Sequence, residues 1–374
     1  MHYEADPNAK YVDIDTLRNF ATDVFMAMGY PEEAAQLSVD VLMTADLRGI
    51  ESHGVGRLKY YYDRLKAGRH LPHMDYEVIK DNPCTAVWDA HHGSGHAISY
   101  KAMEAAIEKA KVYGLGAVTV RNSTHFGIAG YYSIMATKEN MIGITTTNAR
   151  PSICPTWGVK PMLGTNPLTF GFPTDEEFPF VLDCATSIIQ RGVIEYYDRA
   201  GKVTPEGYVI GNDGEYRTDT HEMLDDFEKG KAAFLPLGGK GEDYAGYKGY
   251  GYATVVEMFS AVLSGGSFLW DLVGLTETGE KTHFKLGHTF IAINPEFFMG
   301  IDVAKQTAGE ICRQLRAATL APGAERIWTA GEKEFEAEKR VRAEGVPFNE
   351  GLQGEFNTMR EELGLTQYKF PWDE

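Results

Sequence analysis

The chain has 374 residues, which is enough for about two or three domains with a sizeable core. Its 53 acidic and 36 basic residues give a net charge of -17 at pH 7, which argues against nucleic acid and anionic membrane surfaces as partners. The start of the chain lacks the basic and apolar regions of a signal peptide, and no apolar run approaches the roughly 20 residues that span a bilayer. The cysteines are widely spread, without a disulfide or metal pattern, so we expect a cytoplasmic protein.

Helices are expected first along the chain, over residues 15–68. The second of them opens at Pro31, a residue that suits the first turn of a helix. Its apolar face consists of Ala34, Ala35, Leu37, Val41, Leu42 and Ala45. A shorter helix follows Gly56 and ends at the stop signal Gly68.

Strand and helix patterns mix from about residue 76. Residues 97–113 show a strong helical pattern that ends at Gly114. Short apolar runs predict strands at 116–120, 141–147, 168–172 and 178–183. The glycine-rich, acidic stretch 201–252 is expected to be a loop-heavy surface excursion rather than a domain of its own.

The last part of the chain predicts a buried helix at 252–263, a final strand at 289–293, and amphipathic helices at 303–319 and 332–344. The pattern as a whole predicts an α/β protein in three parts. These are a helical N-terminal part at 1–75, an α/β domain at 76–300, and C-terminal helices at 301–374 that pack on the N-terminal part.

A proton-transfer residue and an anion-binding residue stand close together in Ser52-His53-Gly54 and Arg57. If helical turns begin near Ser52, then His53, Arg57 and Tyr61 fall four apart on one face. Ser52 would be the N-cap, where free backbone N–H groups also favour an anion. Because the arginine fork meets a carboxylate bidentately, the pattern points to hydride chemistry on a small 2-hydroxy acid. The alternative is an ordinary amphipathic helix with a capping serine, a hydrogen-bonded histidine and a solvated arginine.

A second histidine, His125, follows the predicted strand 116–120 in a polar loop. Loops at the carboxyl ends of strands are where α/β proteins place their sites. The alternative is a histidine that only hydrogen-bonds the loop backbone. His91, His92 and His96 stand among glycines, and no further Cys or His cluster completes a metal set, so we interpret them as structural and expect no metal site.

No dinucleotide-binding fingerprint is present. The run Gly93-Ser94-Gly95 lacks a third glycine in place, and residues 241–247 fail the phosphate-loop pattern because no lysine follows the second glycine. The residues alone therefore indicate a 2-hydroxy-acid site but no cofactor.

Five motifs occur in the same order as in a known family. They are Glu51-Ser52-His53-Gly54, Asn122-Ser123-Thr124-His125-Phe126-Gly127, Gly164-Thr165-Asn166-Pro167, Leu182-Asp183-Cys184-Ala185-Thr186-Ser187 and Gly246-Tyr247-Lys248-Gly249-Tyr250-Gly251. In these motifs the chain, from about residue 12 to 350, resembles the malate/L-lactate dehydrogenase family of the second type. That family also includes ureidoglycolate, sulfolactate and diketogulonate oxidoreductases and a cyclic-imine reductase.

The resemblance implies a mixed-sheet, non-Rossmann domain that binds NAD or NADP, together with a helical domain built from the N- and C-terminal segments. It implies a homodimer with the active site close to the subunit interface. The implied activity is hydride transfer between nicotinamide and a small 2-hydroxy acid or 2-oxo acid, with malate or L-lactate as first candidates.

Residue by residue, the resemblance implies that His53 and His125 are the acid-base candidates, and it leaves open which of them takes the hydroxyl proton. Ser52, Arg57 and Tyr61 would lie close to the substrate.

Cofactor contacts are implied for Asp183, Cys184, Ala185, Lys248, Gly331 and Glu332. Lys248 is favoured over Lys240 because the predicted buried helix follows it directly. Gly331-Glu332 is similar to the family's Pro-Gly-Glu motif, although Ala330 replaces the proline. For Asp183 the alternative is a cap of a helix at 186–197.

Two other classes of function stay open at this point. A metal-dependent hydrolase could use the same histidines, and a non-catalytic protein of this fold could bind the cofactor without turnover.

Overall fold

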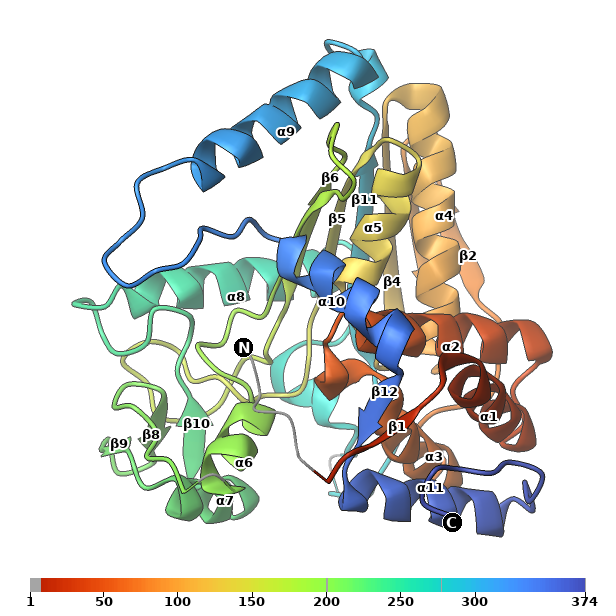
Figure 1. Ribbon diagram of the computed structural model, residues 1–374, viewed down its shortest axis with the longest axis vertical. Helices are drawn as coiled ribbons and strands as arrows, with labels where there is room; N and C mark the ends of the chain where they lie inside the picture. Colours follow the sequence, from red (N-terminus) through yellow and green to blue (C-terminus); the bar gives the residue numbers. More distant parts are fainter. Residues whose placement is uncertain (1–7, 200, 277, 374) are drawn as a thin grey trace.

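A seven-stranded mixed sheet forms the centre of the computed structural model, which describes residues 8–199, 201–276 and 278–373 (Figure 1). The strands lie in the order β2 (Glu77–Asp81), β3 (Thr85–Asp89), β4 (Leu115–Ser123), β11 (Leu286–Ile293), β5 (Ile142–Thr147), β6 (Leu168–Phe172) and β7 (Phe180–Cys184). Only β3 and β4 pair in parallel among these neighbours; the other pairs are antiparallel. The α/β class and the strands expected at 116–120, 141–147, 168–172, 178–183 and 289–293 are confirmed to within a few residues.

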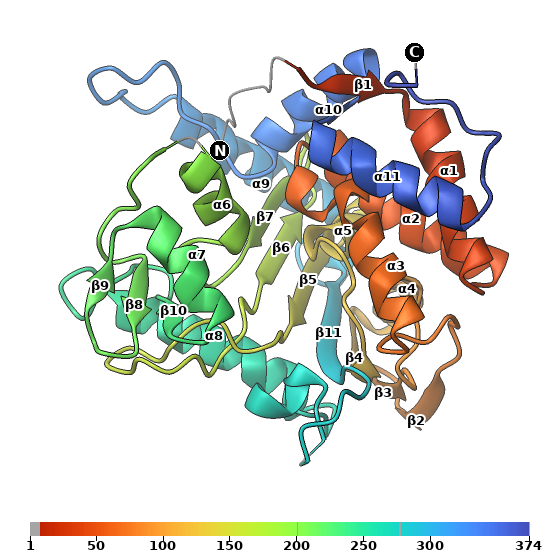
Figure 2. The same ribbon diagram turned by 90° about the horizontal axis from the view of Figure 1, so that it is seen from below.

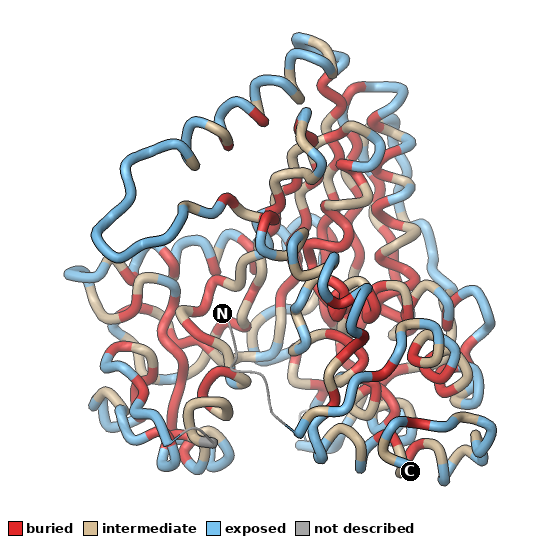
Figure 3. The backbone as a smooth tube through the Cα atoms, viewed as in Figure 1, coloured by how far each residue is buried: buried red, intermediate tan, exposed pale blue. Residues whose placement is uncertain are grey.

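Helices cover both faces of this sheet (Figure 2). Helices α4 (Gly95–Tyr113) and α5 (Gly130–Lys138) pack on one face, and α8 (Gly246–Ala261) packs on the other. Gly116 allows the close contact between β4 and α4, because a Cβ there would stand 1.9 Å from the carbonyl oxygen of Ala106. The central strands are consequently buried, as the tube of Figure 3 shows.

The two ends of the chain share a second core. Helices α1 (Ile14–Ala27), α2 (Glu32–Leu47), α3 (Leu58–Lys66), α10 (Glu332–Glu344) and α11 (Glu350–Glu362) contribute to it. Stacked and edge-on aromatic rings, among them Phe20, Phe348 and Phe356, fill its middle. Strand β1 (Lys10–Val12) pairs antiparallel with β12 (Val346–Phe348), so segments from both ends lie side by side (Figure 1).

Helix α9 (Ile301–Arg316) lies apart from that core. It is anchored on the turn between β6 and β7 by ion pairs from Arg313 to Asp175 and from Arg316 to Glu176. Only Gly309 and Cys312 of this helix are buried, and Figure 3 shows the rest of it as exposed or intermediate.

The expectation of a loop-heavy excursion over 201–252 holds in part, because most residues from 201 to 245 lie outside helices and strands, but the stretch is more ordered than expected. Part of this stretch folds with the preceding helix α6 (Arg191–Arg199) into a small lobe that has its own three-stranded sheet. Its elements are β8 (Val209–Gly211), β9 (Tyr216–Arg217), α7 (Thr220–Glu228) and β10 (Ala232–Phe234). Apolar side chains spaced widely along the sequence, such as Ile194, Val209 and Met223, meet in a separate core, which the local composition does not reveal.

Helix α8 also begins earlier than expected, at Gly246 rather than near Tyr252. The Gly-Tyr-Lys-Gly motif therefore forms its first turn and is not a loop before it. Within the described ranges, no helix combines the length and apolarity that crossing a bilayer requires.

Candidate active site

The motif residues lie at one end of the central sheet. The register places the carboxyl ends of β4, β5 and β7 beside the first residues of β11 and β6, because Ser123 pairs with Leu286, Thr146 with Leu168, and Leu168 with Cys184. The loop after β4 carries His125, and β7 ends with Asp183 and Cys184. Carboxyl ends of strands are a common place for sites in α/β proteins.

The two predicted histidines meet at this end. The rings of His53 and His125 lie 5.8 Å apart between centroids, at 22° to one another. Both are partly exposed although protein atoms surround them closely. Burial, with the nearby charge of Arg57, lowers the pKa of His53 to about 4. Burial and then the neighbouring His53 lower the pKa of His125 well below its usual value, so both rings are neutral at pH 7.

The predicted helical stripe from Ser52 is wrong in detail. Two separate 3-10 turns, Glu51–His53 and Val55–Arg57, precede α3, and Ile50 rather than Ser52 is the N-cap of the first turn. Ser52 instead places its hydroxyl 2.9 Å from Nδ1 of His53. The Nε of Arg57 donates to the carbonyl oxygen of Ser52 at 2.7 Å, so the two motif residues hold the turn together.

Gly54 separates the two turns and has no room for a side chain, because the buried carboxyl group of Asp46 occupies that space. Its backbone is extended, and a Cβ there would stand 1.8 Å from Oδ1 of Asp46. The other oxygen of Asp46 accepts the backbone N–H of Val55 at 2.7 Å, and burial raises the pKa of Asp46 to about 8. Asp46 thereby fixes the loop that presents His53.

A chain of polar contacts fixes the orientation of His125. Its Nδ1 accepts the backbone N–H of Gly127 at 3.3 Å and lies 2.7 Å from the hydroxyl of Tyr61. Since a backbone N–H can only donate, Nδ1 is an acceptor, and the neutral ring carries its proton on Nε2. Tyr61 then donates to His125, and its oxygen can accept from Nε2 of His96 at 3.2 Å.

His96 was interpreted from the sequence as structural, and its place beside Tyr61 was missed. The two residues are 35 positions apart, and no spacing rule links them. His92, by contrast, bonds the backbone oxygen of Phe284 at 2.9 Å. Across the described residues, no three His, Cys, Asp or Glu side chains gather as metal ligands do.

Arg57 is the cation nearest to these rings in sequence, and it is exposed. Apart from its bond to Ser52, it forms no ion pair with any carboxylate in the part of the chain that the structure describes. Its guanidinium is therefore available for an anionic ligand.

The predicted cofactor residues at the end of β7 lie beside α5. Asp183 is exposed at the surface, and its Oδ2 accepts the N–H of Gly130 at 2.9 Å. Helix α6 begins only at Arg191, so the alternative that Asp183 caps a helix from 186 is wrong. Cys184 and Ala185 follow directly and are half-buried.

Lys248 and Lys240 differ in their surroundings. Lys248 lies exposed in the first turn of α8, and among the described residues it forms no ion pair. Lys240 is bound to Glu206 at 2.6 Å. Of these two lysines, Lys248 is therefore the one whose ammonium group is available to a ligand at the start of a helix.

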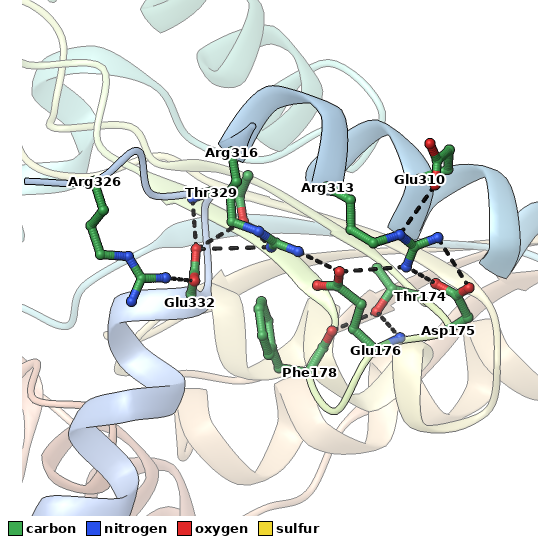
Figure 4. A network of polar contacts seen from close by, with 10 residues as sticks. All are labelled: Thr174, Asp175, Glu176, Phe178, Glu310, Arg313, Arg316, Arg326, Thr329 and Glu332. Carbon is green, nitrogen blue, oxygen red and sulfur yellow. Dashed lines mark hydrogen bonds and ion pairs between the residues drawn. The ribbon is translucent and has the colours of Figure 1, made fainter. Parts of the chain in front are cut away.

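Glu332 belongs to a network of polar contacts (Figure 4), and Gly331 directly precedes it. Gly331 has a φ of +92° and stands against the backbone of Pro179 and Val181, where a Cβ would be too close. Glu332 is buried, accepts the N–H of Thr329 at 3.1 Å and pairs with Arg326. These contacts explain both residues by packing, and a cofactor contact for them stays a prediction.

Comparison with known proteins agrees with this arrangement. The family model described as malate/L-lactate dehydrogenase matches residues 12–357. The chain is 41% identical to a malate dehydrogenase of Pyrococcus abyssi over 96% of this chain and 97% of the relative. It is 40% identical to an L-sulfolactate dehydrogenase of Methanocaldococcus jannaschii over 96% of each chain.

Solved structures show the same likeness. The crystal structure of malate dehydrogenase from Entamoeba histolytica aligns with a TM-score of 0.91 at 42% identity, covering 96% of this chain and 99% of that one. The malate dehydrogenase of Pyrococcus horikoshii aligns with a TM-score of 0.87 at 37% identity, covering 97% and 98% of the two chains. As its ordered motifs predicted, the chain belongs to the malate/L-lactate dehydrogenase family.

Proposed function

We propose that the protein is an NAD- or NADP-dependent oxidoreductase that transfers hydride between nicotinamide and a small 2-hydroxy acid, with malate as the first candidate. One observation carries this proposal: two neutral histidines lie together with Arg57 at the end of the sheet where Asp183 also lies. In the described residues this arginine has no ion-pair partner. The named malate and sulfolactate dehydrogenases among the relatives support the class of substrate. L-Lactate, ureidoglycolate, diketogulonate and cyclic imines are the alternatives.

The residues present fit a nicotinamide dinucleotide. Helix α8 begins without a side-chain cap, and Lys248 in its first turn adds a positive charge, which suits the phosphates of such a cofactor. Asp183, Cys184 and Ala185 would hold the cofactor from the end of β7. When bound, the cofactor accepts or supplies the hydride, while the protein provides position and charge.

The substrate end of the site is assigned to the first loop and α3. Arg57 would hold the carboxylate next to the reacting carbon, because its fork matches two carboxylate oxygens. His125 presents Nε2–H and would polarise the substrate oxygen. His53, neutral at pH 7, would then take the hydroxyl proton when the hydroxy acid is oxidised. Tyr61 and Ser52 hold the two rings in place.

We also propose that the mixed sheet within 76–300 forms the cofactor domain in place of a Rossmann fold. The N-terminal helices, together with α10 and α11, would form a second domain that carries His53 and Arg57. The aromatic core shared by the two ends of the chain supports this division.

A homodimer is the proposed assembly, and the outer face of α8 supports it. Exposed apolar side chains recur at helical spacing along α8 and the turn after it: Tyr252, Val255, Met258 and Phe259 in the helix, and Val262 and Leu263 directly after it. Contiguous apolar surface of this kind marks a contact face.

We predict that replacing Met258 and Val262 together by glutamate prevents dimer formation, since two charges cannot be buried unpaired in an apolar interface. Light scattering should give the mass of two chains for the unmodified protein and of one chain for this double variant. Val203→Glu serves as the matched control, because Val203 is 73% exposed between the polar residues Lys202 and Thr204, and its replacement should leave the mass unchanged. An unmodified protein that is already monomeric would rule the assembly out.

The proposed function predicts that the protein binds NADH or NADPH without added metal and reduces at least one 2-oxo acid. Nicotinamide fluorescence should change on mixing and should persist in the presence of a chelator. Oxaloacetate, pyruvate and related 2-oxo acids are then tested for turnover with each cofactor. Binding that disappears with chelator would favour the metal-dependent hydrolase, and binding without any turnover would favour the non-catalytic protein.

A further inference from the structure

Three arginines converge on one buried aromatic ring beside the candidate active site. The guanidinium carbons of Arg64, Arg69 and Arg150 lie 5.5, 4.4 and 5.6 Å from the ring centroid of Phe284. Arg64 belongs to α3, Arg69 to the segment after it, and Arg150 to the loop after β5. Segments distant in the sequence thus bring three positive charges together.

No carboxylate among the described residues serves as a counterion for these charges. In the described residues none of the three arginines forms an ion pair with a carboxylate, although the chain as a whole has a net charge of -17. Arg69 is only 5% exposed, and its Nη2 donates to the carbonyl oxygen of Val273 at 2.9 Å. Its Nε has no hydrogen-bond partner among the residues that the structure describes. Burial and the charges of Arg64 and Arg150 lower the pKa of Arg69.

Holding three guanidinium groups close together costs free energy when no anion is bound. Like charges close together repel one another, and a buried donor without a partner loses its hydration. An oxyanion that accepts hydrogen bonds from two or three guanidinium groups would remove both costs. The cluster therefore has the chemistry of an anion-binding subsite.

The arginine cluster lies near the reacting end of the candidate site. The ring of Tyr60 lies 6.1 Å from that of His125 and 6.4 Å from that of His70. His70 in turn lies 5.5 Å from Phe284, the ring that the arginines surround. The guanidinium carbon of Arg64 lies 4.9 Å from the centroid of Tyr60, so this one ring neighbours both His125 and the arginine cluster.

Helix α3 also links the two anion-binding groups. Arg57 immediately precedes this helix and Arg64 lies within it, so their Cα atoms are separated by about two turns, or roughly 10 Å along the axis. Both arginine side chains are long and flexible enough to reach the two ends of a short diacid.

We propose that Arg64, Arg69 and Arg150 form a second anion subsite that takes the distal carboxylate or sulfonate of the substrate. The proposal rests on the function assigned above, in which Arg57 holds the carboxylate next to the reacting carbon. It narrows the substrate class to 2-hydroxy acids with two anionic groups, such as malate, and disfavours lactate. A cofactor phosphate has the same oxyanion chemistry, but the first turn of α8, with Lys248, provides a separate place for it.

The test compares a 2-oxo diacid with a 2-oxo monoacid. Catalytic efficiency is measured for oxaloacetate and for 2-oxobutyrate, which has the same chain length without the distal charge, in Arg64→Gln and Arg150→Gln. We expect kcat/KM for oxaloacetate to fall roughly 10- to 10³-fold, mainly through KM, while that for 2-oxobutyrate stays within a few-fold. Arg150→Lys should recover part of the loss. Arg342→Gln is the matched control, because that arginine pairs with Glu338 on the outer surface of α10 and should change neither value.

Arg69→Lys is a secondary variant, because the buried Arg69 also holds the backbone at Val273 and its loss could unfold the protein. Its thermal melting is compared with that of the unmodified protein before its kinetics are used.

Several outcomes would overturn the proposal. Equal losses for the diacid and the monoacid would show that the arginines serve the fold or the reaction in general. A weaker NADH dissociation constant with unchanged discrimination would place a cofactor phosphate at the cluster. If the unmodified protein reduces no 2-oxo acid, the proposed function fails separately, and calorimetry with malate against 2-hydroxybutyrate still tests the subsite: a preference for malate that disappears in Arg150→Gln supports it, and equal binding rejects it.

Discussion

His53→Ala and His125→Ala should each lower kcat roughly 10²- to 10⁴-fold and leave the dissociation constant of NADH close to that of the unmodified protein. Each ring lies at the same end of the sheet, 5.8 Å from the other, and each is held by its own partner. A proton-transfer group acts in the transition state rather than in cofactor binding, so its loss should appear in the rate. Steady-state kinetics with the best 2-oxo acid, and NADH titration by fluorescence, measure the two quantities.

The control is His221→Ala. This histidine is 84% exposed on the small lobe, and it should change neither kcat nor NADH affinity. A His53 or His125 variant that turns over at the normal rate would return that histidine to a role in hydrogen bonding of the loop.

The pH profile of hydroxy-acid oxidation provides a second test of His53 as the base. The base must be neutral, and kcat/KM reports ionisations of the free enzyme. Because the pKa of His53 is lowered to about 4, the efficiency should stay level from neutral pH down to about pH 5 and fall as the pH drops through about 4. A histidine with an ordinary pKa would instead cause the fall near 6.5.

Much of the framework could be predicted from the sequence because its signals are local. The helix at 97–113 has an apolar period and a glycine stop, and Gly114 indeed adopts the left-handed conformation at its end. The ordered motifs also identified the family and predicted that His53 and His125 belong to the same active site. These features depend on neighbours within a few residues or on whole motifs.

Features that depend on burial could not be predicted in this way. At Gly54 the extended backbone packs against the buried carboxyl group of Asp46, eight residues earlier, so a side chain has no room there, and no helix rule contains that information. The small lobe was not predicted because glycines and acidic residues dominate its sequence, while a few scattered apolar residues form its core.

The arginine cluster shows the same limit most clearly. Arg64, Arg69 and Arg150 have no common spacing, and only the pairing of β5 with β11 brings the loop of Arg150 to the segment that carries Phe284. The alternative interpretation of Arg57 as a solvated surface residue was, for a similar reason, left open by the sequence. The structure adds that its guanidinium is bonded to Ser52 and, in the described chain, to no carboxylate.

Arg57→Ala should lower kcat/KM for a 2-oxo acid by roughly 10- to 10³-fold or more. If the guanidinium pairs bidentately with the substrate carboxylate, its removal leaves that carboxylate without a partner in the closed site, at a cost of roughly 2–5 kcal/mol, and about 1.4 kcal/mol corresponds to tenfold in rate. Arg57→Lys should recover only part of the loss, because an ammonium group keeps the charge but not the planar fork. NADH affinity should barely change, since the proposed cofactor residues lie on β7 and α8.

The same variants separate a substrate contact from a structural one. Arg57 also donates from Nε to the carbonyl oxygen of Ser52, so its loss could disturb the loop of His53 and slow every substrate alike. The best 2-oxo acid and its C1 amide differ only in the group beside the reacting carbon, which is a carboxylate in one and an uncharged carboxamide in the other. The ratio of their kcat/KM values cancels any general effect of loop disorder. We expect the unmodified protein to prefer the acid strongly, Arg57→Ala to lose that preference, and Arg57→Lys to lie between them. Equal discrimination in the unmodified protein and in Arg57→Ala would show that the carboxylate is held elsewhere, because a group that does not contact the carboxylate cannot set the ratio between these two substrates.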